Sequence, residues 1–186
     1  NDVIIKEKIN LLVISYGGSA SNTLTNVLEK NNYTIKTKTW HKLLCHCPKY
    51  IETDIPIIYI YDNPIKSFLS MKRRKQQIWG VNQKKLSNNN NIVLSDENLL
   101  KLMINQFNSW TNIRRDNILI IKSCELFKNS VLNKLECFLK RKLNYFPLQY
   151  INPNISIKNI EEQYKYNKLF KKYKLEIDKI NHFTMN

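Results

Sequence analysis

Two turns in this sequence combine residue types and spacing that could bind or transfer a charged group. The first follows the apolar run 11–14 and contains Gly17 and Gly18, which can adopt backbone angles closed to other residues. Small side chains follow, a helix capped by Ser21 or Asn22 is expected next, and the free amides of a helix N-terminus attract anions. We therefore interpret this turn as a phosphate-binding loop, with an ordinary strand-to-helix turn as the alternative. Its residues are Gly17, Gly18, Ser19, Ala20, Ser21, Asn22 and Thr23.

The second turn follows the apolar run 57–61. Pro64 suits the first position of a helix capped by Asn63 or Asp62. Apolar residues at helical spacing continue this helix: Ile65, Phe68 and Leu69. Two strand-turn-helix units in series indicate a parallel sheet with right-handed crossovers. Because ligands bind at the carboxyl ends of such strands, we expect the two turns to converge there.

Hydrophobic periodicity predicts the other elements. Val3–Ile5 suits a short edge strand, Tyr33–Trp40 alternates as a partly exposed strand would, and Ile118–Ile121 suits a buried strand. Ser95 is expected to cap a helix, and another helix is expected from about Ser130 to Lys140. The first of these helices carries an apolar stripe that belongs to the core: Leu99, Leu100, Met103, Phe107 and Trp110. The predicted fold is a three-layer α/β sandwich with a mainly parallel sheet of four or five strands.

The length and the charge of the chain limit which domain organisation and which partners are possible. Its 186 residues suit one domain over 1–186, with a core at about 9–145 and a C-terminal helical extension over 146–186. Thirty basic and fifteen acidic residues give a net charge of +15, which attracts anionic partners. No run approaches the ~20 apolar residues that cross a bilayer, so no transmembrane segment is expected. Four cysteines without framework spacing favour reduced thiols and a cytoplasmic location.

A metal site is a weaker interpretation of the sequence. His41 and the segment Cys45, His46 and Cys47 place four nitrogen and sulfur donors within seven residues. Donors so close together would make a strained tetrahedral site, and no second pair follows at the usual spacing. We therefore expect no metal.

Taken together, these segments resemble the sulfotransferase family, whose members transfer a sulfuryl group from 3′-phosphoadenosine 5′-phosphosulfate (PAPS) to hydroxyls or amines on a P-loop-like fold. The family's first loop, Pro-Lys/Arg-Ser-Gly-Thr-Thr-x-Leu, matches residues 17–24 and implies that they hold the 5′-phosphosulfate. Its second motif, Arg-x-Pro with a Ser six residues later, matches Asp62, Pro64 and Ser70 and implies a 3′-phosphate site. The later segment ILIIKSCELFKNSVLNKLECFLK also matches the family pattern.

The chain departs from this family pattern at two positions. The loop Lys or Arg is Gly18 here, and the Arg of the second motif is Asp62. Each lost cation removes a charge-assisted hydrogen bond that contributes about 1.5 to 3 kcal/mol. Lys66 or the cluster Lys72–Lys75 is a candidate source of replacement charge.

The resemblance also implies catalytic residues. The segment 38–41 is similar to the Lys-Thr-His segment that holds the base in many family members, with His41 displaced by one residue. His41 is then the expected base, and Lys38 would steady the sulfuryl group. A surface histidine beside a lysine is an equally good interpretation of the same residues.

Three functions follow, in order of preference. The first is a PAPS-dependent sulfotransferase-like enzyme acting on a small-molecule or glycan acceptor, which the sequence does not identify. The second is a protein of the same fold that binds nucleotides or anions without catalysis. The third, a nucleic-acid-binding protein, is not favoured because no recognised motif accompanies the basic clusters. These clusters are 72–75, 84–85, 114–115 and 140–142.

Overall fold

The computed structural model describes residues 2–37, 44–73, 95–147 and 157–184. Their centre is a parallel sheet of three strands in the order β1-β2-β3. The strands are β1 (Leu12–Ile14), β2 (Ile57–Tyr61) and β3 (Ile118–Lys122). In the register of the sheet, Val13 lies opposite Ile58 and Tyr59 lies opposite Ile120. The expected α/β class and parallel sheet are therefore confirmed.

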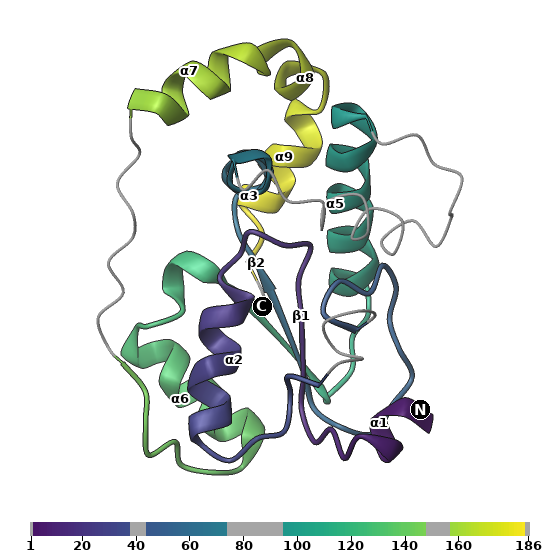
Figure 1. The fold of residues 1–186 in the computed structure, drawn as a ribbon, viewed down its shortest axis with the longest axis vertical. Helices are drawn as coiled ribbons and strands as arrows, with labels where there is room; N and C mark the ends of the chain where they lie inside the picture. The colour runs from purple at the N-terminus through teal and green to yellow at the C-terminus, as the bar shows by residue number, and fades with distance from the viewer. Residues whose placement is uncertain (1, 38–43, 74–94, 148–156, 185–186) are drawn as a thin grey trace.

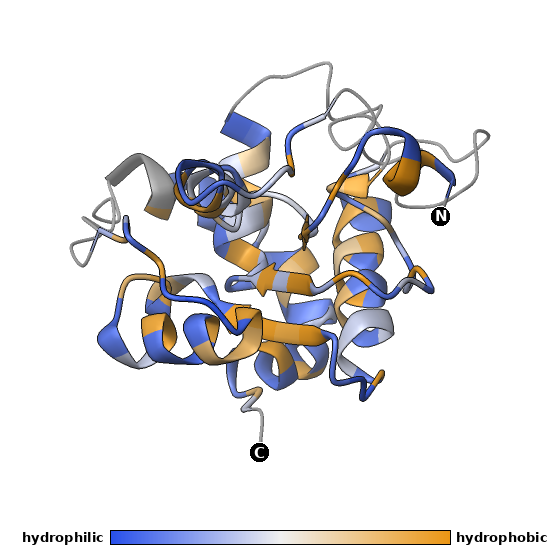
Figure 2. Ribbon diagram, turned by 90° about the horizontal axis from the view of Figure 1, so that it is seen from below, coloured by the Kyte–Doolittle hydropathy of each residue, from blue (hydrophilic) through white to orange (hydrophobic). Residues whose placement is uncertain are grey.

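Helices cover both faces of this sheet (Figure 1). The helices α2 (Ser21–Lys30) and α6 (Asn129–Leu139) lie on one side, and α5 (Asp96–Thr111) lies on the other. Every residue of β1 and β2 is buried, as expected for strands covered on both faces. Figure 2 shows apolar residues along the strands and on parts of the surrounding helices.

Two strands expected from the sequence are not strands in the structure. Val3–Ile5 lies within a helix, α1 (Asp2–Lys6), because its backbone bonds close locally, with the Glu7 amide donating to the Val3 carbonyl at 3.0 Å; only Ile4 is buried. Residues 33–37 are irregular, although Ile35 is fully buried and the Thr34 carbonyl accepts a hydrogen bond from the Asn10 amide. The rest of that expected strand, 38–40, lies outside the described residues, which form three strands instead of four or five.

Local sequence signals account for the helix starts on either side of the sheet. The helix α3 (Pro64–Arg73) begins as predicted, because the Asn63 side-chain oxygen accepts hydrogen bonds from the amides of Ile65 and Lys66. Ser95 caps α5 by accepting a hydrogen bond from the Asn98 amide. The predicted stripe of α5 is buried, and Trp110 stacks on Tyr59 of β2 at 5.8 Å between ring centroids.

The C-terminal helices pack against α3 and α5. They are α7 (Ile157–Lys165), α8 (Asn167–Lys172) and α9 (Lys174–Asn181). Phe68 of α3 meets the rings of Tyr166 and Phe170 edge-on. Beyond α9, the Phe183 carbonyl accepts a hydrogen bond from the Tyr61 hydroxyl, so the extension reaches the carboxyl end of β2.

Candidate functional site

The loop between β1 and α2 has the left-handed backbone that its glycines permit. Gly17 and Gly18 have φ angles of 94° and 69°, and Ala20 follows at 60°. The helix begins at Ser21, so Ala20 is the N-cap residue and our prediction of Ser21 or Asn22 as the cap is wrong. The physical reason is that the Ser21 hydroxyl turns inward, where it accepts a hydrogen bond from Ser15 Oγ at 3.2 Å.

A row of backbone amides at this loop has no hydrogen-bond acceptor among the described residues. The Gly17 amide donates to Ser15 Oγ, and the Thr23 amide donates to the Ala20 carbonyl. Among the described residues, no group accepts a hydrogen bond from the amides between these two, which belong to residues 18–22. Five successive donors at the positive end of a ten-residue helix form an arrangement that can bind an anion.

The side chains of the loop divide it into a closed inner part and an open outer part. Ser19 is 1% exposed, and its hydroxyl donates to the Ile60 carbonyl at 3.2 Å. Asn22 and Thr23, in contrast, are exposed at the start of α2. A ligand could therefore approach from solvent at Asn22 and Thr23, and at the partly buried Ala20, while Ser21 is turned inward.

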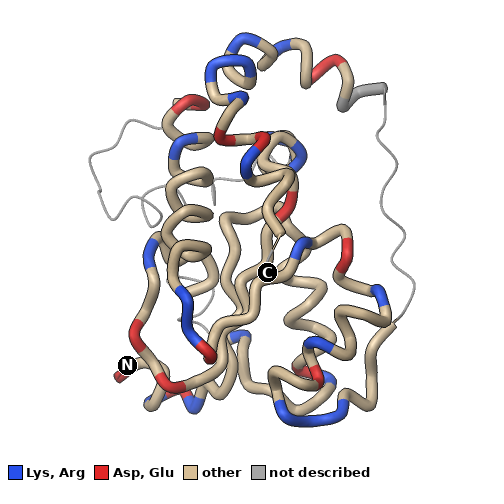
Figure 3. Tube along the Cα trace, turned by 180° about the vertical axis from the view of Figure 1, so that it is seen from behind, with Lys and Arg blue, Asp and Glu red and all other residues tan. Residues whose placement is uncertain are grey.

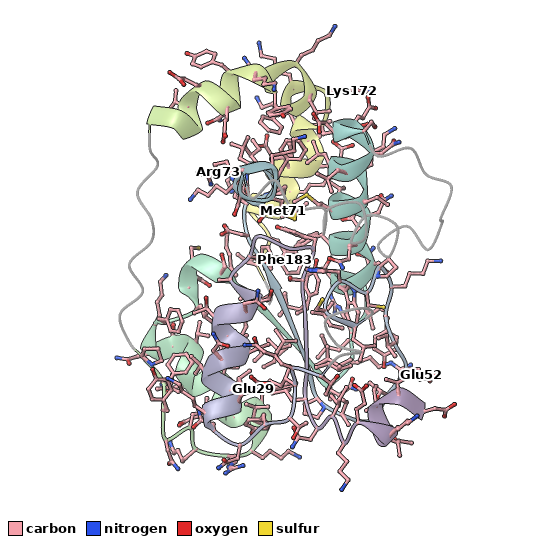
Figure 4. The ribbon with its side chains drawn as sticks, in the orientation of Figure 1. Glu29, Glu52, Met71, Arg73, Lys172 and Phe183 are labelled. Atoms are coloured by element: carbon pink, nitrogen blue, oxygen red, sulfur yellow. The ribbon has the colours of Figure 1, made fainter. Side chains whose placement is uncertain are left out.

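The two glycines serve a purpose that the sequence did not indicate. A Cβ on Gly18 would lie 2.8 Å from the Ser67 carbonyl oxygen, and one on Gly17 would lie 2.7 Å from Met71 Sδ. Both neighbours belong to α3, and Figure 4 shows Met71 on the side of α3 that faces the sheet. The glycines therefore allow α3 to pack closely on the loop, in addition to allowing its left-handed backbone.

Asp62 joins this loop through Tyr16, as the predicted convergence of the two turns requires. The Tyr16 hydroxyl donates to the Asp62 carbonyl and accepts from the Asp62 amide at 3.0 Å. The Asp62 carboxylate accepts from the Asn63 amide at 2.6 Å, and the side chain is partly exposed. Ser70, the other residue of the second motif, lies on α3 and is partly buried.

Two of the candidate replacement cations on α3 are already paired. Lys72 Nζ lies 2.8 Å from Asp96 Oδ1, and this hydrogen bond is the main cause of the raised pKa of Lys72. Arg73 Nε lies 3.7 Å from Glu162 Oε2, on the outer side of α3 in Figure 4. The hypothesis that these two residues supply charge to the loop is therefore not supported. Lys66 is exposed in the first turn of α3, and residues 74–75 lie outside the described ranges.

The proposed catalytic pair falls in a part of the chain that the structure does not describe. His41 and Lys38 both lie within 38–43. The structure therefore neither places them at the loop nor separates them from it.

Another histidine, His46, lies beside the loop and was considered from the sequence only as a possible metal ligand. Its Nδ1 lies 2.8 Å from the Ser15 carbonyl oxygen, so Nδ1 carries the proton of this hydrogen bond. Its Cε1 lies 3.4 Å from the position of a Cβ on Gly17. The Ser15 amide donates to the Cys45 carbonyl at 2.9 Å, so two adjacent residues hold the end of β1.

A buried polar side chain on α5 supports this arrangement. Gln106 is 1% exposed, and its Nε2 donates to the Cys47 carbonyl at 2.8 Å and to the Ser15 carbonyl at 3.3 Å. Trp110 Nε1 donates to the same Cys47 carbonyl at 3.0 Å. A glutamine within an otherwise apolar helical face is a sequence signal that could have identified this network.

No three His, Cys, Asp or Glu side chains within the described ranges lie close enough to hold a metal ion. Cys45, Cys47, Cys124 and Cys137 are free thiols, and burial raises the pKa of Cys47. No helix in the described part of the chain is long and apolar enough to cross a membrane.

No protein-family model, curated protein or solved structure matches the chain. The site is therefore interpreted from its geometry, together with the resemblance of its motifs.

Proposed function

We propose that this chain is a sulfotransferase-like enzyme with a P-loop-like fold, which binds the phosphosulfate group of PAPS at residues 17–23. The observation that carries this proposal is the row of amides at residues 18–22, for which the described chain provides no acceptor. The loop lies at the carboxyl end of a buried parallel strand, where α/β proteins bind ligands.

Backbone amides can compensate for the missing loop cation. A hydrogen bond to a charged group contributes about 1.5 to 3 kcal/mol, and a phosphosulfate offers several oxygens to the amide row. Two or three such bonds would therefore equal or exceed the contribution of the Lys or Arg that Gly18 replaces. The loop can consequently retain anion binding without a basic side chain.

The proposed reaction is in-line transfer of a sulfuryl group to an acceptor hydroxyl or amine in a cytoplasmic setting. The acceptor oxygen or nitrogen forms a bond to sulfur while the bond from sulfur to the leaving phosphate oxygen breaks. His41 would accept the proton of the attacking group, and Lys38 would steady the sulfuryl group during the transfer. No metal takes part in this proposal.

The second candidate is a protein that binds the nucleotide or another anion without transferring a group. Asp62 favours it, because a carboxylate stands where the resemblance implies an Arg that pairs with the 3′-phosphate. The pairing of Lys72 with Asp96 and of Arg73 with Glu162 removes two sources of compensating charge.

Calorimetric titration tests the binding proposal. The purified chain is titrated with adenosine 3′,5′-bisphosphate and with ADP at two salt concentrations. We expect micromolar binding that prefers the bisphosphate and persists at the higher salt concentration. Absence of binding, or weak binding that salt abolishes for both ligands alike, would contradict the proposal.

A transfer assay separates the two candidates. PAPS labelled with sulfur-35 is incubated with the chain and a panel of phenols, alcohols, amines and glycans, and labelled product is measured. The enzyme candidate predicts a labelled product that His41→Ala abolishes while bisphosphate binding is unchanged. Binding without any labelled product supports the second candidate.

A further inference from the structure

A basic surface forms where α2 and α6 end, at the opposite end of α2 from the amide row. It is defined here as the basic-aromatic patch and consists of Lys30, Tyr33, Lys140, Arg141, Lys142 and Tyr145. With ten residues, α2 separates the patch from the loop by about 15 Å. The inference below concerns this second surface and does not depend on the function proposed for the loop.

Specific contacts join the parts of the patch into one surface. Lys30 Nζ lies 4.2 Å from the centre of the Tyr145 ring, and Arg141 Cζ lies 5.8 Å from that of Tyr33. Between these pairs, the side chain of Asn31 donates to the Tyr145 carbonyl at 2.7 Å and accepts from the Tyr145 amide at 3.1 Å. Residues from the end of α2 and from the turn after α6 are thus held side by side.

The turn that carries three of the basic residues has a defined backbone. Lys140 adopts a left-handed conformation with φ of 51°, its amide donates to the Cys137 carbonyl, and the Arg141 amide donates to the Glu136 carbonyl. These features are those of a Schellman motif, which ends helices and is usually formed with glycine. Its backbone holds 140–142 in place, so their side chains start from fixed positions.

The charge of the patch points outward. Lys142 Nζ pairs with Glu136 Oε2 at 2.8 Å, yet the Lys142 side chain is 87% exposed, whereas that of Glu136 is 13% exposed and also accepts from the Leu143 amide. Lys30, Lys140 and Arg141 are exposed as well. Figure 3 shows Lys and Arg residues gathered at this lower end of the molecule. The negative end of a helix dipole attracts cations, but it acts only within the last turn and does not account for the exposed aromatic ring beside them.

We propose that the basic-aromatic patch binds single-stranded nucleic acid. Basic side chains next to aromatic rings suit a chain that alternates phosphates with stacking bases. Tyr145 is 43% exposed and is the ring available for stacking at the surface. A membrane surface fits less well, because the apolar part of the patch is limited to two tyrosine rings.

Fluorescence anisotropy with a labelled oligodeoxythymidine of about 16 nucleotides tests the proposal. The patch variant carries Lys30→Gln, Arg141→Gln and Lys142→Gln. The control variant carries Lys168→Gln, Lys171→Gln and Lys174→Gln, which lie on exposed positions of α8 and α9 at the other end of the molecule and remove the same charge. Thermal unfolding of each variant confirms that it is folded.

We expect the patch variant to bind the oligonucleotide at least tenfold more weakly than the control variant. Its plot of log affinity against log salt concentration should also lose a slope of about 2, because three phosphate contacts contribute roughly 0.7 each on a single strand. Tyr145→Ala should weaken binding roughly tenfold, whereas Tyr145→Phe should retain it.

Three results would overturn the proposal. Equal weakening by the two triple variants would mean that the total charge of the molecule, and not the patch, attracts the oligonucleotide. Unchanged binding by Tyr145→Ala would exclude base stacking. Stronger binding to anionic vesicles or to a sulfated glycan, with the same sensitivity to the patch variant, would assign the surface to another partner.

Discussion

The Tyr16 hydroxyl binds both backbone groups of Asp62, donating to its carbonyl and accepting from its amide. This pair of hydrogen bonds connects the end of β1 with the end of β2, just before the start of α3. Because only the backbone of Asp62 takes part, the link does not depend on which side chain position 62 carries. The geometry of the two turns is therefore separable from the charge at that position.

Tyr16→Phe should destabilise the fold. Removal of the hydroxyl leaves the Asp62 amide and carbonyl without their partner, and leaving a buried polar group unpaired costs about 1 to 3 kcal/mol. Urea denaturation followed by circular dichroism measures the loss. Tyr61→Phe serves as the control, because the Tyr61 hydroxyl donates one hydrogen bond, to the Phe183 carbonyl, and its removal should cost less. Equal stability of wild type and Tyr16→Phe would contradict this prediction.

The chain should lose stability in alkaline solution. Burial is the main cause of raised pKa values at three tyrosines. It raises the pKa of Tyr16 and of Tyr59, and it raises the pKa of Tyr61 to about 12. The unfolded chain releases these protons from about pH 10, where the folded chain still holds them, so stability is complete below pH 10 and falls above it. The free energy of unfolding of Tyr16→Phe should therefore fall less steeply than that of the wild type between about pH 9 and 11. This range covers about one unit on either side of the ordinary tyrosine pKa. Parallel pH profiles would show that Tyr16 does not contribute.

Acid should loosen the contact between α5 and the C-terminal helices. Hydrogen bonds from Lys172, Tyr173 and Lys101 lower the pKa of Glu97 from 4.5 to about 2. A lowered pKa stabilises the fold above the unfolded value, and this contribution is lost as the pH falls from 4.5 towards 2. Glu97→Gln should therefore flatten the dependence of the unfolding midpoint on pH in that window. High salt should reduce the difference, because the Glu97 side chain is partly exposed to solvent.

Two substitutions in the loop should change stability in opposite directions. Gly18→Ala places a Cβ 2.8 Å from the Ser67 carbonyl oxygen at a φ of 69°, so it should destabilise by at least about 1 to 2 kcal/mol. Ala20→Gly relieves a left-handed alanine and should stabilise by up to about 1 kcal/mol. Thermal unfolding measures both changes. Destabilisation by Ala20→Gly would mean that the loop is less ordered than the structure shows.

Asp62→Arg should strengthen binding of adenosine 3′,5′-bisphosphate. The change removes a repulsive carboxylate and introduces the cation that the resemblance implies, and a charge-assisted hydrogen bond of about 1.5 to 3 kcal/mol corresponds to tenfold or more in affinity. Asp62→Asn, which removes only the repulsion, should give a smaller gain. Calorimetry with ADP as the comparison shows whether the gain depends on the 3′-phosphate. No gain for either variant would place the 3′-phosphate elsewhere.

Local signals allowed part of the fold to be predicted from the sequence. The strand 57–61 has the predicted bounds because Pro56 precedes it and the segment 62–64 stops it. Ser95 and Asn63 cap their helices as expected, since capping depends on residues within one turn. The buried stripe of α5 follows from helical periodicity alone.

The features that could not be predicted from the sequence depend on packing between segments far apart in the chain. Alternation alone could not reveal that Ile4 is the inward residue of a short helix, or that 33–37 reaches the core through Ile35 without pairing in the sheet. The close approach of α3 to Gly18 depends on how α3 packs on the loop, and no local pattern encodes that distance. The contact between His46 and Ser15 likewise spans 31 positions in the chain.

The contacts at Ser15 also bear on how copies of this protein behave at high concentration. β1 is an outer strand of the three that the structure describes, and an open strand edge is a template for pairing with a second molecule. At Ser15 the amide is bound by the Cys45 carbonyl and the carbonyl is bound by His46. The segment 45–46 thus occupies the backbone groups that an incoming strand would need, and protects that end of β1 from edge-to-edge aggregation.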